Sequence, residues 1–368
     1  MSAALFTPIP LRDVTVRNRL WVSPLCQYSC EERDGVPNDW HLVHLGSFAR
    51  GGAGLVMAEA TAVVPEGRIS PWDTGIWDDA QVQAWRRVTD FIAGQGAVPA
   101  IQLAHAGRKA STYREWSGRG TVPAEDGGWT TVAPSPIAFP GYEPPVALDE
   151  GGIADVVEAF AAAARRALDA GFAVLEVHAA HGYLLHQFLS PASNVRTDRW
   201  GGSLENRARL LLEVTRRVRE VAGDGVPVLV RVSATDWIEP AGWTLDESVT
   251  VAGWLSEAGA DVIDTSTGGL LLASIPVGPG YQVPHAEAIR SGAGIVTTAV
   301  GLIADARQAE EIVASGQADA VFAGREFMRD PHFALRAAHE LDVDIDYWPV
   351  QYRRAPFDAR PSLTHAED

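Results

Sequence analysis

The chain has 368 residues, of which 46% are hydrophobic and 21% charged, so it is long enough to bury a large core. Its formal net charge of -17 gives a surface that repels nucleic-acid phosphates and anionic lipid head groups, which argues against nucleic-acid and membrane-surface roles and favours small-molecule partners. The two cysteines, Cys26 and Cys30, are too few for a disulfide framework or for paired zinc knuckles.

The N-terminal sequence MSAALFTPIPLRD lacks the basic and apolar regions of a secretory signal peptide. No uninterrupted apolar run of about 18 residues, the length that spans a bilayer, follows it anywhere in the chain. We therefore expect a cytoplasmic protein.

Short apolar runs with high β-propensity recur along the chain, with helix-like segments between them. The candidate strands are Leu20–Gln27, Gly54–Val63, Val98–His105, Phe172–Ala180, Val226–Ala234, Ala260–Gly269, Gly294–Ile303 and Ala318–Phe327. Because runs such as VPVLVRVSA are nearly continuous rather than alternating, they are typical of strands buried on both faces of a parallel sheet. Helical periodicity with charged outer faces occurs, for example, at Asp78–Ala93, Ile153–Asp169, Leu204–Val221, Asp246–Glu257 and Ala306–Ala314.

Eight successive β-then-α units predict a single (β/α)8 barrel, the TIM-barrel fold, with a doubly wound open sheet as the alternative. No internal repeat or linker divides the chain, so we expect one domain over residues 1–368, with a tail from about residue 340. The connections Ala106–Glu150 and His181–Ser203 follow the third and fourth predicted strands and are too long for plain turns. Long loops at that end of a barrel usually form lids and binding sites.

Chemically reactive side chains stand where the fourth strand ends, in the sequence HAAHGY. His178 and His181 can each donate an N–H to one carbonyl, carboxylate or nitro oxygen, and the phenol of Tyr183 can deliver a proton. A zinc site is a competing interpretation, but the HExxH pattern is absent and we expect no metal. Histidines that only stabilise a loop are the structural alternative.

Two polar residues interrupt apolar strands. Arg231 in VPVLVRVSA is costly to bury unless an anion or an electron-rich ring faces it, and an ion pair with a carboxylate such as Glu176 is the structural alternative. Gln102 in AIQLAH carries an amide suited to a ring with both donor and acceptor edges, such as the pyrimidine edge of a flavin.

The ends of the seventh and eighth strands resemble a barrel phosphate site. Gly301 and Gly324 let backbone N–H groups approach an anion, and Arg325 adds a forked positive charge. A tight turn at Gly324 with Arg325 on the surface is the alternative.

Four segments, SPLCQY, QLAHAGRKA, HAAHGYLLHQFLSPASNVRTDRWGGSLENRARL and AGREFMRDP, together closely resemble the Old Yellow Enzyme family. The resemblance covers about residues 5–355, and the segment at 178–210 is the most specific part of it. Cys26, Tyr28 and the C-terminal QYRRA resemble the thermophilic-like subclass, which includes bacterial NADPH dehydrogenases and xenobiotic reductases.

This resemblance implies non-covalently bound FMN, with NADPH or NADH as reductant. It implies cofactor contacts from Ser23, Pro24, Leu25, Cys26, Ala60, Gln102, Arg231, Ser266, Gly301, Gly324 and Arg325. In it, Arg231 lies beside the N1/O2 end of the flavin, Cys26 tunes its redox potential, and Ser266, Gly301, Gly324 and Arg325 hold the phosphate. Leu25 departs from relatives, which frequently carry methionine there.

The resemblance further implies substrate contacts from Tyr28, His178, His181, Tyr183 and Arg354, with Arg354 reaching into a neighbouring subunit of a homodimer or homotetramer. The implied reaction is ping-pong hydride transfer through flavin N5 to activated C=C bonds of enones, enals, maleimides or nitroalkenes. His178 and His181 would bind the activating oxygen, and Tyr183 would protonate the α-carbon.

Three other functions are alternatives to this reaction. Multidomain relatives such as dienoyl-CoA reductases and amine dehydrogenases add an iron–sulfur cysteine cluster and a second nucleotide-binding domain, which this sequence lacks. A flavin-free barrel lyase or aldolase needs a Schiff-base lysine at a strand end, whereas Lys109 falls only in a predicted loop. A non-catalytic binding protein is the third alternative, but burying so many polar strand ends without using them would lower its stability.

Overall fold

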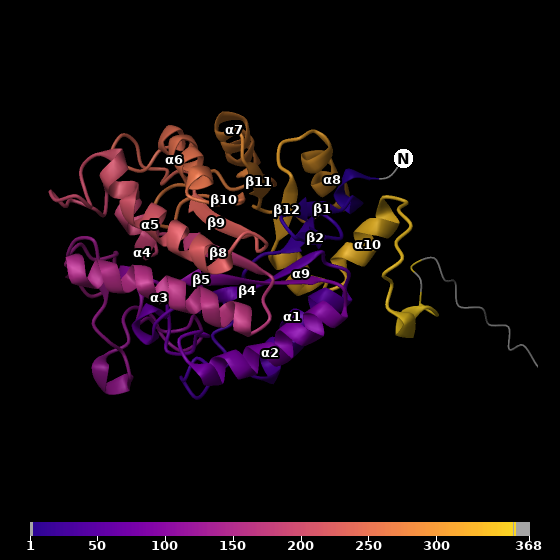
Figure 1. Ribbon diagram of the computed structural model, residues 1–368, viewed down its shortest axis with the longest axis horizontal. Helices are drawn as coiled ribbons and strands as arrows, with labels where there is room; N and C mark the ends of the chain where they lie inside the picture. The colour runs from indigo at the N-terminus through magenta and orange to yellow at the C-terminus, as the bar shows by residue number, and fades with distance from the viewer. Residues whose placement is uncertain (1–2, 356, 358–368) are drawn as a thin grey trace, which may run out of the picture.

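A computed structural model describes residues 3–355 and 357. Within these residues eight parallel strands close into a barrel, in which each strand pairs with the next barrel strand along the chain and the last pairs with the first (Figure 1). They are β3 (Leu20–Val22), β4 (Leu55–Ala62), β5 (Val98–Ala104), β8 (Val174–Ala179), β9 (Val228–Ser233), β10 (Val262–Ser266), β11 (Val296–Ala299) and β12 (Ala320–Ala323). Each lies inside one predicted run, so the predicted (β/α)8 barrel is confirmed.

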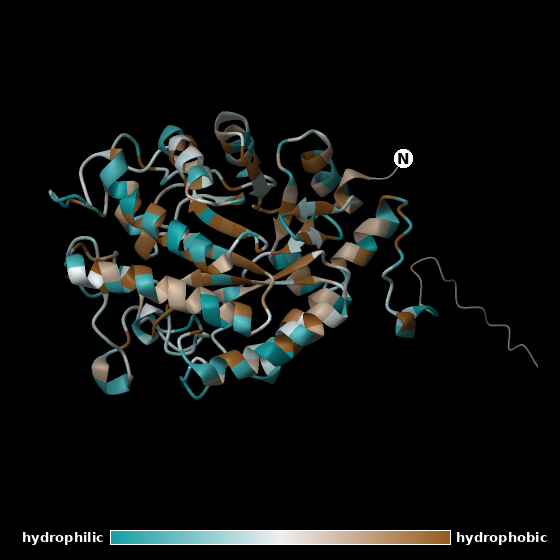
Figure 2. Cartoon of the chain, in the orientation of Figure 1, coloured by the Kyte–Doolittle hydropathy of each residue, from teal (hydrophilic) through white to brown (hydrophobic). Residues whose placement is uncertain are grey.

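Helices surround the barrel. They are α1 (Asp39–Arg50), α2 (Asp79–Gly94), α3 (Glu150–Asp169), α4 (Leu184–Leu189), α5 (Leu204–Ala222), α6 (Leu245–Glu257), α7 (Val283–Ala293), α8 (Ala306–Ala314), α9 (Arg325–Arg329) and α10 (Phe333–Glu340). Figure 2 shows hydrophobic residues along the central strands and mixed, more hydrophilic surfaces on the helices around them. Capping boxes at Asn38, Asp78 and Thr244 fix where α1, α2 and α6 begin.

A short antiparallel hairpin, β1 (Ile9–Leu11) with β2 (Val14–Val16), precedes the barrel and was not predicted. Its buried side chains belong to the same hydrophobic cluster as Trp21 and Phe322 and the residues that begin the barrel strands. The rings of Trp21 and Phe322 meet edge to face with centroids 5.4 Å apart. The hairpin therefore packs against the amino-terminal end of the barrel interior.

Several predicted strands extend too far in the carboxyl direction. The first strand ends at Val22, so Ser23–Gln27 forms a loop, and the eighth ends at Ala323, so Phe327 is buried in α9 instead. Of these residues, Leu25 lines a pocket and Phe327 packs against Phe48 and Phe333. A hydrophobic run does not distinguish such positions from burial in a strand.

The two long connections contain short elements. Ala106–Glu150 includes β6 (Val132–Ala133) and β7 (Val146–Ala147), and His181–Ser203 includes α4. After α10 the chain makes a 3₁₀ turn at Val350–Tyr352, and the predicted tail also includes 356 and 358–368, which lie outside the described residues. None of the described helices is both long enough and apolar enough to cross a membrane.

Candidate active site

A pocket opens at the carboxyl-terminal ends of the barrel strands, and most of the predicted cofactor residues line it. They are Ser23, Pro24, Leu25, Arg231, Ser266, Gly301, Gly324 and Arg325. Tyr281, Gln282, Glu326 and Arg329 also line it and were not predicted. Tyr281 and Gln282 come from the connection before α7, in which no sequence motif stands out.

Gly301 leaves room for this arrangement. Its φ is +121°, and a Cβ atom there would lie 2.9 Å from the Gln282 amide nitrogen, so only glycine fits without displacing that side chain. The hydroxyl of Ser23 is buried in the same pocket wall without a hydrogen-bond partner among the described residues. A polar ligand would satisfy this hydroxyl.

His178, His181 and Tyr183 come together at the end of β8. The ring centroids of His178 and His181 are 5.2 Å apart, and those of His178 and Tyr183 are 5.0 Å apart. His178 Nδ1 accepts the Ala180 N–H at 3.3 Å, so its proton is assigned to Nε2, which is free to donate. The three residues predicted from HAAHGY therefore share one small volume.

Both histidines are neutral near pH 7. Burial lowers the pKa of His178 and of His181 well below the usual range, and the charge of Arg231 adds to that effect. His181 Nε2 lies 2.7 Å from the Ser266 hydroxyl, which in turn donates to Gln282 Oε1 at 3.2 Å. Ser266, predicted to hold a phosphate, thus also contacts a predicted substrate-binding histidine.

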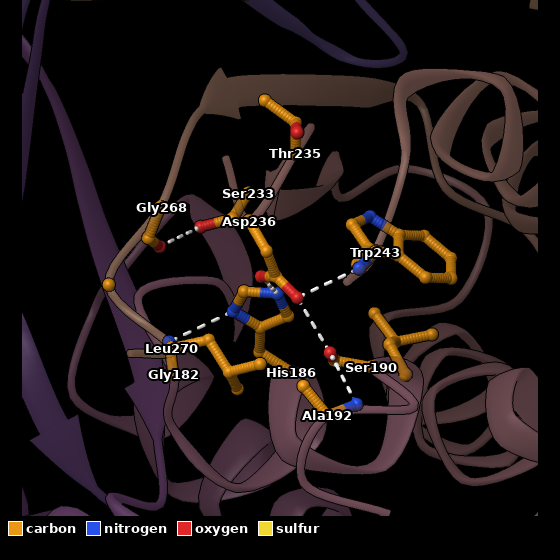
Figure 3. Close-up of polar contacts among 12 residues, drawn as sticks. Gly182, His186, Ser190, Ala192, Ser233, Thr235, Asp236, Trp243, Gly268 and Leu270 are labelled. Atoms are coloured by element: carbon orange, nitrogen blue, oxygen red, sulfur yellow. Dashed lines mark hydrogen bonds and ion pairs between the residues drawn. The ribbon is translucent and has the colours of Figure 1, made fainter. Parts of the chain in front are cut away.

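A third histidine supports the turn that carries His181 (Figure 3). His186 in α4 accepts the Gly182 N–H at Nδ1 over 2.9 Å, and its Nε2 lies 3.0 Å from Asp236 Oδ1. The Ser190 hydroxyl and the backbone N–H of Trp243 donate to Asp236 Oδ2 at 2.6 and 2.8 Å. This network was not predicted from the sequence, although His186 follows His181 within the same motif.

The backbone of this turn is tightly constrained. His181 has a φ of +56°, and a Cβ atom on Gly182 would lie 2.4 Å from the Gly269 carbonyl oxygen. The Lys109 ammonium donates to the carbonyls of His181 and Gly269 at 2.8 and 3.0 Å. Burial and Arg108 lower the pKa of Lys109 to about 8. A left-handed histidine is strained and persists only where such contacts fix it.

An apolar cluster lies beside the histidines. Ala60 and Ala104 pack there with Cys26, Tyr28 and Tyr183. Burial, with the charges of Asp73 and Glu59, raises the pKa of Cys26 well above its usual range. The side chain is therefore a thiol rather than a nucleophilic thiolate at neutral pH, and its tuning role stays a prediction.

The barrel interior beneath the pocket contains the remaining predicted polar residues. Gln102 donates to Glu176 at 2.7 Å. Arg231 forms its ion pair with Asp264, at 3.1 Å from Nε to Oδ2, so the suggested ion pair with Glu176 was wrong in its partner. Asp264 interrupts an apolar strand just as Arg231 does, and that signal was available in the sequence.

Arg354 is exposed in the C-terminal segment and does not line the pocket. Its predicted role in a neighbouring subunit stays a prediction. No group of three or more His, Cys, Asp or Glu side chains within residues 3–355 and 357 is arranged to hold a metal ion.

Comparisons with known proteins agree on one family. Residues 4–344 match the model of the NADH:flavin oxidoreductase / NADH oxidase family. An NADPH dehydrogenase of Listeria monocytogenes serotype 4b is 48% identical over 352 residues, which cover 95% of this chain and 98% of the relative.

Solved structures give the same result. Morphinone reductase superposes with a TM-score of 0.78 at 30% identity, covering 94% of this chain and 91% of that one. The Old Yellow Enzyme homologue of Zymomonas mobilis superposes with a TM-score of 0.77 at 29% identity, covering 96% and 98%.

Proposed function

The chain belongs to the NADH:flavin oxidoreductase / NADH oxidase family, of the Old Yellow Enzyme type, and is an FMN- and NAD(P)H-dependent oxidoreductase; on this premise we propose that it reduces activated C=C bonds. The substrates would be enones, enals, maleimides or nitroalkenes. The observation that carries this proposal is the convergence of His178, His181 and Tyr183 beside the pocket.

The residues present fit FMN. Arg325 and the glycine cradle at Gly301 would suit a phosphate, and the unpartnered Ser23 hydroxyl in the same pocket wall would offer the cofactor a further polar contact. Gln102 and Arg231 supply the amide and the cation that a flavin pyrimidine edge can bind. We propose that residues 1–368 form one FMN-binding domain around these contacts.

When bound, FMN supplies hydride transfer from the reduced nicotinamide to the alkene. The protein's own contribution is to hold the substrate and to manage charge. His178 would donate its Nε2–H to the carbonyl or nitro oxygen, and His181 would do the same by exchanging its contact with Ser266 for the substrate. The two N–H groups would stabilise the negative charge that develops on that oxygen. Because their pKa values are low, both imidazoles are neutral N–H donors, and no imidazolium charge is buried in the pocket.

Tyr183 is the proposed acid that protonates the α-carbon. Burial, with Cys26 and Asp73, raises the pKa of its phenol well above the usual range, so the phenol holds its proton until a basic carbon is formed. Tyr28, in the same cluster, would contact the rest of the substrate, and Arg354 would do so from the partner subunit of a dimer or tetramer.

The first test is the absorption spectrum of the purified protein, followed anaerobically by NADPH and then by 2-cyclohexen-1-one. We expect flavin absorbance that bleaches with NADPH and returns with the enone. A protein that bleaches with NADPH but never recovers with any activated alkene would refute alkene reduction. A protein that stays colourless after incubation with FMN would instead favour a flavin-free lyase or aldolase.

A further inference from the structure

The barrel interior holds five polar side chains on neighbouring strands. Gln102 of β5 pairs in register with Glu176 of β8, and Asp264 of β10 pairs in register with Arg231 of β9 and Thr298 of β11. Glu176 and Asp264 are completely buried. Two carboxyl groups therefore lie within a region that water does not reach.

The two carboxyl groups lack donors for two of their four oxygen atoms. Glu176 Oε1 accepts from Gln102 at 2.7 Å, and Asp264 Oδ1 accepts from the Thr298 hydroxyl at 2.8 Å. Among the described residues no group donates a hydrogen bond to Glu176 Oε2 or to Asp264 Oδ2. Such unsatisfied buried acceptors are rare and costly. Asp264 Oδ2 has only the ion-pair contact with Arg231 Nε at 3.1 Å. The Glu176 and Asp264 carboxyl groups lie within hydrogen-bonding reach of each other, so a single proton between them would give the unpartnered Glu176 oxygen a partner.

The balance of charge requires the same proton. Two ionised carboxylates would face one guanidinium, that of Arg231, which contacts Asp264 at 3.1 Å. An uncompensated negative charge in this buried region is strongly unfavourable, and one carboxyl group normally retains a proton instead. Asp264 has the direct contact with Arg231, whereas Glu176 has only the amide of Gln102, so the proton belongs on Glu176.

We propose that Glu176 and Asp264 share one proton, so that Glu176 is a neutral carboxylic acid that positions Gln102 and leaves Asp264 as the counter-ion of Arg231. Both are positioning residues rather than catalytic residues. In agreement, burial and the charge of Asp264 raise the pKa of Glu176 to about 8, and burial also raises the pKa of Asp264.

The groups that face Glu176 from the neighbouring strands are few. They are Gln102 on β5, Arg231 on β9 and Asp264 on β10, with His178 two residues further along β8 itself. His178 is neutral in this pH range, so within this cluster Glu176 is the group whose charge is expected to change near pH 8. Lys109, beside His181, has a pKa of about 8 as well, and its ionisation is common to the wild-type protein and a Glu176 variant.

This proton has a consequence for the cofactor, and that consequence rests on the proposed function. Reduction adds negative charge to the flavin, beside Arg231. If Glu176 loses its proton, a second negative charge appears close to Arg231 and offsets its effect. We therefore expect reduction of the bound FMN to become less favourable as the pH rises through about 8.

The first experiment uses the protein without FMN. Infrared difference spectra between pH 7 and higher pH should show the C=O stretch of a protonated carboxylic acid that disappears through about pH 8. Glu176→Gln, which reproduces the donor and acceptor of the neutral acid, should abolish this band. Glu66→Gln, at an exposed glutamate, should leave it unchanged.

A second variant keeps the test decisive if Glu176→Gln does not fold. In Asp264→Asn, Glu176 becomes the only carboxyl group facing Arg231, so the band should be lost at lower pH than in the unmodified protein. A wild-type protein with no protonated-carboxyl band at pH 7, or a component lost through about pH 8 that is unchanged in Glu176→Gln, would overturn the proposal. A band from Asp73, a second buried carboxyl group with a raised pKa, would remain in both proteins.

The second experiment uses the FMN-loaded protein and measures the flavin midpoint potential from pH 6 to 10. The wild-type curve should show an added pH dependence near 8 that Glu176→Gln loses. A wild-type curve identical to that of Glu176→Gln would refute the effect on the cofactor while the infrared result still decides the shared proton. Failure to bind FMN at all would refute the proposed function and not the proton pair.

Discussion

The two ends of the barrel differ in the side chains that fill them, although the same strands run through both. At the amino-terminal end, hairpin β1–β2 covers an interior of Trp21, Phe322 and aliphatic side chains. At the carboxyl-terminal end His178, Arg231 and Ser266 lie at or near the ends of β8, β9 and β10, and the buried Ser23 Oγ has no hydrogen-bond partner among the described residues. One end is closed by packing, and the other keeps polar groups in place for a ligand.

This difference indicates that the stability of the fold and its function depend on residues at different ends of the barrel. Packing at the closed end contributes to the free energy of unfolding, and of the two aromatic residues named there Phe322 also lines the pocket. Polar groups at the open end cost stability unless they are paired, and their value lies in what they bind. Substitutions at the two ends should therefore affect different measurements.

The largest effect is expected at the closed end. Trp21→Ala removes a completely buried indole and should lower the free energy of unfolding by about 3–5 kcal/mol. Turnover per folded, FMN-bound molecule should stay close to wild type. Urea unfolding and kinetics would measure both quantities, with Trp40→Ala as the control because Trp40 is 56% exposed. Loss of turnover per folded molecule would contradict the view that packing at the closed end affects stability alone.

The reverse result is expected at the open end. His181→Ala should lower the rate of enone reduction by about 10²–10³-fold, as for the loss of an oxyanion donor, with little change in the free energy of unfolding. Stopped-flow reoxidation of the reduced enzyme by enone isolates this step. NADPH-driven reduction of the flavin and a His332→Ala variant provide controls. Equal losses in both half-reactions would contradict a role in binding the substrate oxygen.

The network behind His181 should show an intermediate effect. Asp236→Asn weakens the contact with His186 and should cost about 1–3 kcal/mol of stability at pH 7. Burial opposes ionisation of Asp236, but His186 and Ser190 outweigh it and lower its pKa below the usual value.

The pH dependence of this effect has a definite sign. Because the folded-state pKa of Asp236 lies below the unfolded value, its contribution is complete above the unfolded pKa and is lost as the pH falls through the folded one. The stability difference between wild type and Asp236→Asn should therefore shrink in acid, as measured by chemical unfolding between pH 3 and 7. A difference that is constant over this range would show that the charge of Asp236 does not support the turn.

The sequence predicted the repeating part of the fold and the residues at strand ends. Continuous apolar runs marked the eight barrel strands, and HAAHGY placed His178, His181 and Tyr183 correctly in one volume. The strand boundary failed at Ser23–Gln27 because Pro24, Leu25 and Cys26 continue the apolar run although the strand ends at Val22.

Long-range contacts were the part that the sequence did not specify. Gln282 reaches the Val300 carbonyl and Ser266 from a connection with no motif, and Asp236 meets His186 across 50 residues of chain. The hairpin β1–β2 has strands of only three residues, which is too short for a clear alternation. Such features depend on tertiary packing rather than on local pattern.

The smallest effect is expected at Leu25, at the open end. A Cβ atom placed on Gly324 would lie 3.0 Å from Leu25 Cδ2, so Leu25 packs closely against the proposed phosphate loop. Leu25→Met conserves volume and adds flexibility, and should change the free energy of unfolding by less than about 1.5 kcal/mol. FMN affinity, measured by fluorescence titration of the apoprotein, should change little if residue 25 contacts the flavin mainly through its backbone. A large loss of affinity would mean that the Leu25 side chain itself shapes the cofactor pocket, and that the open end also depends on packing.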